Sequence, residues 1–251
     1  MPGMAEQALD QAAALLRGAT RVAVLTGAGV SAESGVPTFR GGGGLWEGQP
    51  VEQVATPEAF LDDPERVWRF YEQRRRNLLP IRPNPAHDVL ARWQDHFPDY
   101  TLVTQNVDGL HQAAGARGVL ELHGNIWRVR CAGCGRERLE RTVPLPELPP
   151  RCTACGALER PGVVWFGEML PQDVLARAWE AAEQAQVLVV VGTSALVYPA
   201  AGLLEVTARH GGTVIEVNPE PSALAFIAAI ALRGPAGEVL PRLAARVGGP
   251  R

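Results

Sequence analysis

The stretch GAGVSAESGVPTFRG, residues 27–41, directly follows the apolar run Val22–Leu25. An apolar strand that ends in two glycines, Gly27 and Gly29, lets backbone amides approach a phosphate without obstruction by side chains, as in dinucleotide-binding folds. The simple GxGxxG fingerprint is incomplete, because the next glycine is Gly35. A Gly-Ala-Gly sequence alone could also mark a tight turn. The stretch as a whole predicts a nucleotide site at the end of a strand.

Length and charge restrict the function further. The 251 residues suffice for one large α/β domain with an insertion. A net charge of -3 and a pI near 6.0 leave no basic footprint for nucleic acid or for an anionic membrane. Residues 1–13 do not resemble a signal peptide, and the apolar run Ala223–Leu232 is too short to span a bilayer. We therefore expect a cytoplasmic protein whose partners are small molecules or peptides. The oligomeric state stays open, a monomer included.

All 24 basic residues are arginine, and the sequence contains no lysine. This absence excludes enzymes that depend on a Walker lysine, on a Schiff-base lysine or on a Tyr/Lys pair.

The four cysteines form two CxxC pairs that are separated by 17 residues: Cys131, Cys134, Cys152 and Cys155. This spacing is typical of a zinc ribbon, in which two knuckles complete a tetrahedron of thiolates. Two disulfides would require an oxidising compartment, and a thioredoxin-like site would need only one pair. The sequence therefore predicts one structural zinc ion and no cysteine nucleophile.

Strand and helix patterns alternate as in a doubly wound parallel sheet. The expected strands are Arg21–Thr26, Tyr100–Thr104, Val187–Val191 and Thr213–Val217. The expected helices are Met4–Ala19, Pro85–Phe97, Gln172–Ala185, Pro199–His210 and Glu238–Val247. Helical patterns also cover Thr56–Leu79, with starts near Pro57 and Pro64. For Ala223–Leu232, propensity allows a helix.

Polar residues follow several of these strands, at the sheet edge where open α/β folds bind their ligands. They are Gln105, Asn106 and Asp108 after the second strand, Gly192–Ser194 after the third, and Asn218–Glu220 after the fourth. Among the five histidines, His123 ends an apolar run just before a glycine. We expect structural hydrogen bonds for His87 and His111, and exposed helix ends for His96 and His210.

Five separated motifs, together with the cysteine spacing, resemble the sirtuins, which are NAD-dependent protein lysine deacylases. They are residues 27–41, QNVDGLH at 105–111, LELHGN at 120–125, PGVVWFGE at 161–168 and LVYPA at 196–200. The resemblance runs from about Thr20 to Ala245. It implies a Rossmann-type NAD-binding domain of residues 1–40, 98–125 and 161–251. A helical insertion (41–97) and a zinc-ribbon insertion (126–160) would form a small module, with the site in the cleft between. It also implies a short strand within 223–232.

The resemblance implies His123, Asn106 and Asp108 as catalytic residues, with His123 as the general base on a ribose hydroxyl. The acyl oxygen of acyl-lysine would displace nicotinamide, and water would finally release lysine and O-acyl-ADP-ribose. The loop Gly41–Gly44 would order over NAD, and Phe39 would cover one face of the ribose. The residues implied to contact NAD are Gly27, Ala28, Gly29, Ser31, Ala32, Thr38, Phe39, Arg40, Trp46, Gln105, Asn106, Asp108, Gly192, Thr193, Ser194, Asn218, Pro219, Glu220 and Ala236.

The resemblance also implies an acyl pocket, in which the helix of residues 65–79 takes part. Tyr71 and Arg74 are three residues apart, so one carboxylate could bind both. From composition alone, a solvated run of arginines beside a half-buried tyrosine is the preferred interpretation. The resemblance instead suggests the class that removes succinyl and malonyl groups, with Ala55 widening the pocket. Val164 and Phe166 would flank the acyl-lysine peptide on a strand edge within Val163–Phe166, which could also be an ordinary core strand.

The sequence therefore predicts a protein lysine deacylase with desuccinylase and demalonylase activity and some deacetylase activity. A deacetylase alone, or a mono-ADP-ribosyltransferase, would use the same NAD loop. A zinc-ribbon binding module with a vestigial nucleotide domain would show no turnover, and a hydride-transfer dehydrogenase would need a substrate acid/base pair that is not recognisable here.

Overall fold

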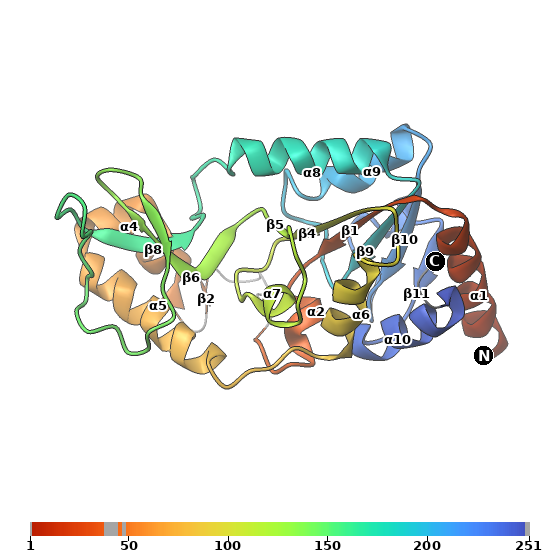
Figure 1. Cartoon of the computed structure of the whole chain (residues 1–251), viewed down its shortest axis with the longest axis horizontal. Helices are drawn as coiled ribbons and strands as arrows, with labels where there is room; N and C mark the ends of the chain where they lie inside the picture. Colours follow the sequence, from red (N-terminus) through yellow and green to blue (C-terminus); the bar gives the residue numbers. More distant parts are fainter. Residues whose placement is uncertain (1, 38–44, 47–48, 249–251) are drawn as a thin grey trace.

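A computed structural model describes residues 2–37, 45–46 and 49–248. Its main feature is a six-stranded sheet, parallel throughout, in the order β11-β10-β9-β1-β4-β5 (Figure 1). The strands are β1 (Arg21–Thr26), β4 (Asp99–Thr104), β5 (Leu120–Glu121), β9 (Val187–Val191), β10 (Thr213–Val217) and β11 (Ile230–Leu232). The sheet confirms the predicted doubly wound fold.

The strand order contains one reversal. From β1 the chain builds outward through β4 and β5, then returns to place β9 on the other side of β1 and continues to β10 and β11. The connections that follow β1 and β9 therefore lead to opposite sides of the sheet, and both leave from its carboxyl edge. Such a switch point is where open α/β sheets bind ligands.

Helices cover both faces of this sheet (Figure 1). One face packs against α1 (Pro2–Gly18), α6 (Pro85–Trp93) and α10 (Ala236–Val247), and the other against α8 (Gln172–Gln184) and α9 (Gly202–Arg209). Alternate residues of one strand point to opposite cores, as Val24 and Leu25 show. Because both faces are buried, the strands are apolar throughout rather than alternating.

A third core lies in a small module at one end of the molecule, at the left of Figure 1. It joins the helices α3 (Val51–Val54), α4 (Pro57–Asp62) and α5 (Pro64–Leu78) to a three-stranded sheet in the order β7-β6-β8. The strands are β6 (Gly124–Cys131), β7 (Glu137–Leu139) and β8 (Glu159–Val163). Thr56 and Asp63 cap α4 and α5, which begin at the predicted prolines.

The remaining short elements connect these layers. They are α2 (Gly29–Ala32), α7 (Leu110–Ala113), the antiparallel pair β2 (Leu45–Trp46) and β3 (Gln49–Pro50), and the 3₁₀ turn Ala225–Ile227. Although α6 falls within the predicted insertion 41–97, it packs into the core of the large sheet. The predicted division into domains stays a prediction.

Several expectations differ from the structure. The helix expected over Pro85–Phe97 ends at Trp93. A turn follows, in which the backbone N–H of His96 donates to the Trp93 carbonyl. His96 is consequently buried, not exposed as predicted. The helix expected from Pro199 begins at Gly202, after a turn.

The predicted strand Val163–Phe166 is wrong beyond Val163, where β8 ends. After that point the backbone N–H of Val164 donates to the His123 carbonyl at 2.9 Å, and that of Phe166 to the Ala55 carbonyl at 3.0 Å.

Residues 223–232 do not form the α-helix that their propensity allows. Residues 230–232 pair with β10, so tertiary pairing overrides local preference and confirms the short strand. Among the helices of the described residues, none has the length and hydropathy to cross a bilayer.

Candidate functional site

Two glycine loops cross at the switch point between β1 and β9. The N–H of Gly27 donates to the Val191 carbonyl at 3.0 Å, and that of Gly29 to the Gly192 carbonyl at 2.7 Å. A Cβ built on Gly29 would lie 2.7 Å from the Gly192 backbone, which leaves no room for a side chain. The sequence predicts that these glycines let a phosphate approach the backbone. In the structure they also allow the loop after β1 to contact the loop after β9.

Three other backbone amides lie in these two loops. Within the described part of the chain, no acceptor pairs with the backbone N–H groups of Ala28, Thr193 and Ser194. Side chains fix the loop around them, because Gln105 Nε2 donates to Thr193 Oγ1 at 3.0 Å and Asn218 Nδ2 to the Thr193 carbonyl at 2.9 Å. Unpaired backbone donors at a sheet edge suit a dinucleotide phosphate. These residues therefore fit NAD.

A buried network surrounds Ser31, at the middle of the glycine loop. Its hydroxyl donates to Asp108 Oδ2 at 2.8 Å and accepts from Asn106 Nδ2 at 3.2 Å. His87 Nε2 lies 3.3 Å from the same hydroxyl. The His87 Nδ1 accepts from the Asn84 N–H, so Nε2 carries the ring proton and donates to Ser31. The predicted structural role of His87 thus connects α6 to the glycine loop.

Asp108 is held from several sides. The N–H of Leu110 donates to its Oδ1 at 2.8 Å, and Trp127 Nε1 donates to its carbonyl at 2.7 Å. Burial raises the pKa of the carboxyl, and the bonds from Leu110 and Ser31 and the charge of Arg74 oppose that rise. Asp108 therefore lies within the electrostatic reach of Arg74, which comes from α5.

His87 and His111 form a buried pair with ring centroids 5.0 Å apart. Burial lowers the pKa of His87 to about 4, and burial together with His87 lowers that of His111 to about 3. Both rings are therefore neutral in the folded protein, whereas in the unfolded chain they titrate near pH 6.5.

This pair predicts a pH-dependent stability. Below pH 6.5 the unfolded chain binds protons at His87 and His111 and the folded chain does not, so stability is lost as the pH falls from 6.5 toward 4. The expected slope is up to about 1.4 kcal/mol per pH unit for each histidine. Urea unfolding at several pH values measures it. His111→Gln should reduce the slope, and the matched change at the exposed His210 should not. An unchanged slope in His111→Gln would contradict the assignment.

His123 lies between β5 and β6, facing the second strand-end loop. Its Nδ1 is 2.9 Å from the Gln105 carbonyl, which can only accept, so Nδ1 carries the proton and Nε2 is left as a base. Burial lowers the pKa of His123, and the bond to Gln105 partly opposes this. The ring is therefore an oriented neutral base near pH 7.

Two of the predicted acyl-pocket residues, Ala55 and Tyr71, belong to the third core. Tyr71 is 0% exposed and Arg74 is 6% exposed, so the preferred solvated interpretation of these positions is wrong. Both lie on the buried face of α5. Ala55 is buried as well, and its carbonyl accepts the Phe166 N–H.

The four cysteines come together beside the three-stranded sheet, where Cys131 ends β6. Their sulfur atoms all lie within 4.8 Å of one another, with Cys131 and Cys155 at 3.4 Å and Cys134 and Cys152 at 3.8 Å. A tetrahedron of zinc–sulfur bonds of about 2.3 Å has sulfur–sulfur edges of about 3.8 Å. The N–H groups of Gly133 and Cys134 each donate to Cys131 Sγ at 3.3 Å. The cluster could bind one zinc ion.

Sequence reasoning missed several residues that shape this site. Arg75, fully buried on α5, donates to the carbonyls of Glu140 and Thr142. It thereby anchors the predicted zinc-ribbon insertion (126–160) to α5. Glu216, buried in β10, accepts from the Ser222 N–H and pairs with Arg233, which fixes the loop after β10. A carboxylate inside the apolar run TVIEV was the available signal for Glu216.

Other predicted residues lie at the ends of helices or in the loop after β10. Ala32 is exposed at the end of α2, Pro219 and Glu220 are exposed after β10, and Ala236 begins α10, whose Gly237 N–H donates to Glu33. Thr38, Phe39, Arg40, the loop Gly41–Gly44 and the side chain of Trp46 lie outside the described residues.

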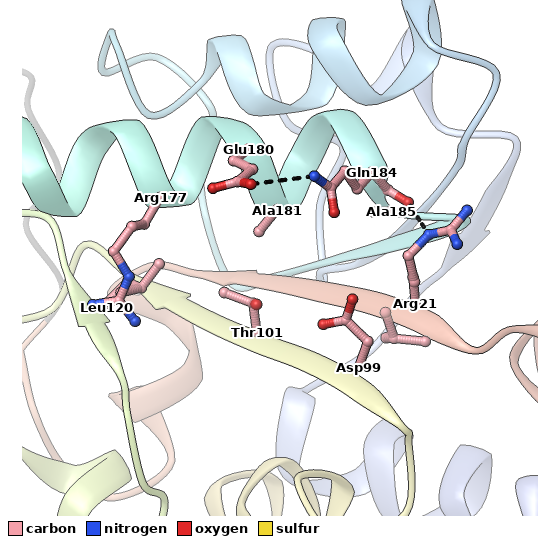
Figure 2. Close-up of a pocket in the computed structure, with 10 residues that line it drawn as sticks. Arg21, Asp99, Thr101, Leu120, Arg177, Glu180, Ala181, Gln184 and Ala185 are labelled. Atoms are coloured by element: carbon pink, nitrogen blue, oxygen red, sulfur yellow. Dashed lines mark hydrogen bonds between the residues drawn. The ribbon is translucent and has the colours of Figure 1, made fainter.

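A pocket of about 230 Å³ lies at the opposite, amino edge of the large sheet (Figure 2). Arg177 and Glu180 of α8 line it together with Asp99 and Thr101 of β4. Because β1 and β4 begin here, this pocket is a strand length away from the glycine loops. It contains none of the predicted site residues.

Comparison with known proteins assigns this site to a family. A protein-family model described as "Sir2 family" matches residues 27–199, more than half of the chain. The chain belongs to the Sir2, or sirtuin, family. An NAD-dependent protein deacylase of Aquifex aeolicus is 56% identical over 207 residues, which are 82% of this chain and 87% of that protein. Another, of Thermococcus kodakarensis, is 51% identical over 245 residues, 95% of each.

Solved structures agree with this assignment. A Sir2 homologue in complex with NAD is 46% identical, covers 94% of this chain and 93% of its own, and has a TM-score of 0.88. A Sir2 protein with a peptide and NAD⁺ is 34% identical, covers 91% and 94%, and has a TM-score of 0.81. The chain is an NAD-dependent protein deacylase, and its four cysteines could bind one zinc ion.

Proposed function

We propose that the enzyme removes succinyl and malonyl groups from lysine side chains of proteins or peptides, with some deacetylation. The observation that carries this proposal is the burial of Arg74 beside Tyr71 on one face of α5, within electrostatic reach of Asp108. A guanidinium binds a carboxylate through charge-assisted hydrogen bonds, and a tyrosine hydroxyl beside it can donate a further one. The carboxylate of an acidic acyl chain suits both donors.

The residues at the switch point would hold NAD and the substrate for reaction. NAD supplies a ribose carbon whose bond to nicotinamide can break. The amides of Ala28, Thr193 and Ser194 would bind its phosphates, and Asn106 and Asp108 would bind its nicotinamide ribose and carboxamide. His123 Nε2 would accept a proton from a ribose hydroxyl, since Gln105 holds the opposite nitrogen. Val164 and Phe166 would flank the acyl-lysine.

Arg74→Met tests the acyl preference. The expected result is a loss of about 10-fold to 100-fold in kcat/KM on a succinyl-lysine peptide, because a hydrogen bond to a charged group contributes about 1.5 to 3 kcal/mol. Activity on the same peptide carrying acetyl-lysine should fall far less. Mass spectrometry with and without NAD measures both.

Arg76→Met is the matched control, because the Arg76 side chain on the same helix is 53% exposed and pairs with Glu72. Equal losses on both peptides in Arg74→Met would mean that Arg74 only packs. If the wild-type enzyme removes acetyl alone, the acidic-acyl proposal fails. If ADP-ribose appears on protein without loss of any acyl group, the activity is ADP-ribosyl transfer.

A further inference from the structure

Trp165 lies between the two residues proposed to flank the substrate, yet it points the other way. Phe166 is 51% exposed, whereas Trp165 is 3% exposed and belongs to the core of the small module. Its indole Nε1 donates to the Tyr71 hydroxyl oxygen at 3.0 Å. One side chain therefore joins the substrate-flanking segment to the acyl-pocket helix α5.

In this hydrogen bond Trp165 is the donor and Tyr71 the acceptor, because an indole N–H can only donate. The hydroxyl proton of Tyr71 therefore cannot be donated to Trp165. That proton must be directed toward another group. Burial raises the pKa of Tyr71 to about 12, so the phenol keeps its proton at neutral pH. A hydroxyl in this state is a donor, which is what a carboxylate requires.

Two side chains contact the indole ring. The guanidinium carbon of Arg160 lies 3.4 Å from the ring centroid, and the Phe60 ring lies at 5.4 Å. Glu168 accepts from Arg160 Nη1 at 2.5 Å and from the Trp165 backbone N–H at 2.8 Å. The ion pair between Arg160 and Glu168 thus holds both the indole ring and the backbone of Trp165.

The sequence neighbours of Trp165 connect it to His123 and to Ala55. Val164 on one side donates to the His123 carbonyl, and Phe166 on the other donates to the Ala55 carbonyl. We propose that Trp165 is a positioning residue that orients the Tyr71 hydroxyl as a donor to acidic acyl chains and sets its place relative to His123. This inference rests on the acidic-acyl activity proposed above.

Trp165→Phe tests it, because a phenyl ring retains the contacts with Arg160 and Phe60 and lacks the N–H. The expected result is a decrease of about 10-fold in the ratio of kcat/KM on succinyl-lysine to that on acetyl-lysine, seen mainly as a higher KM for the succinyl peptide. Trp68→Phe is the matched control. Trp68 is in the same core and donates from Nε1 to the Glu159 carbonyl at 2.7 Å. It should leave the ratio unchanged.

Tyr71→Phe and the double variant Trp165→Phe/Tyr71→Phe complete the experiment. If Trp165 acts through the Tyr71 hydroxyl, the two single variants lower the ratio and the double variant lowers it no further. Additive losses would overturn the inference. Should Trp165→Phe not fold, an unchanged ratio in Tyr71→Phe would overturn it as well.

The two proposals fail in different ways. A wild-type enzyme that removes no succinyl group overturns both. A wild-type enzyme that removes succinyl, with the same ratio in Trp165→Phe, overturns only the positioning role of Trp165.

Discussion

His123→Ala is expected to lose deacylation by a factor of about 10² to 10⁴ while still binding NAD. The loss follows from removing the proposed general base, because a positioned general base contributes about that much to the rate. Binding should persist because the crossing loops at Gly27–Gly29 and Gly192–Ser194 do not depend on the imidazole. Steady-state kinetics and calorimetric titration with NAD measure the two effects. His210→Ala, at the exposed end of α9, is the control. Full turnover by His123→Ala would remove this residue from the mechanism.

The pH profile gives the same assignment a second test. Burial lowers the pKa of His123 below its ordinary 6.5, so the neutral, basic form persists to lower pH. The acid limb of kcat/KM is therefore expected below pH 6.5. An acid limb of kcat/KM above pH 6.5 would contradict a lowered pKa of His123.

Loss of the metal is expected to have the largest effect on stability. Cys155→Ser removes one of the four cysteines that could bind zinc, and structural zinc contributes about 10 to 16 kcal/mol of apparent binding free energy in small metal-dependent domains. The small module should unfold, since β6 and β8 carry the cysteine turns and also contribute to the third core. Deacylation should cease, because the proposed acyl-pocket residue Tyr71 belongs to that core.

Zinc content, tryptophan fluorescence and circular dichroism test this result. Trp68, Trp127 and Trp165 lie in the third core, so their emission should change while the helix signal of the large-sheet layers persists. Thr153→Ala is the matched control, because Thr153 is an exposed non-ligand in the same CxxC turn. A stable, zinc-free Cys155→Ser enzyme with full activity would contradict a structural role for the metal.

Local patterns predicted much of the fold. The strands Arg21–Thr26, Val187–Val191 and Thr213–Val217 have the bounds that were expected, because strands buried on both faces are continuous apolar runs. Helix ends were less accurate, as at Trp93, where a turn through His96 replaces the last helical turn. Such ends depend on capping and packing partners that are distant in sequence.

The arginines of α5 show why the site was only partly predictable. Arg74, Arg75 and Arg76 are consecutive in sequence, yet the first two are buried and the third is exposed. Helical periodicity could assign them to different faces of α5, but it could not say which face packs against residues 126–160. In the structure Arg75 faces that segment, because it donates to the carbonyls of Glu140 and Thr142.

The sequence by itself determined the family, the parallel sheet and the cysteine cluster, since these depend on motifs and spacings that are local in the chain. Only the tertiary structure decided how Ser31, His87 and Asp108 form one network and how Trp165 reaches Tyr71. The physical reason is that a buried polar group must find its partner in space, and that partner comes from whichever segment packs beside it.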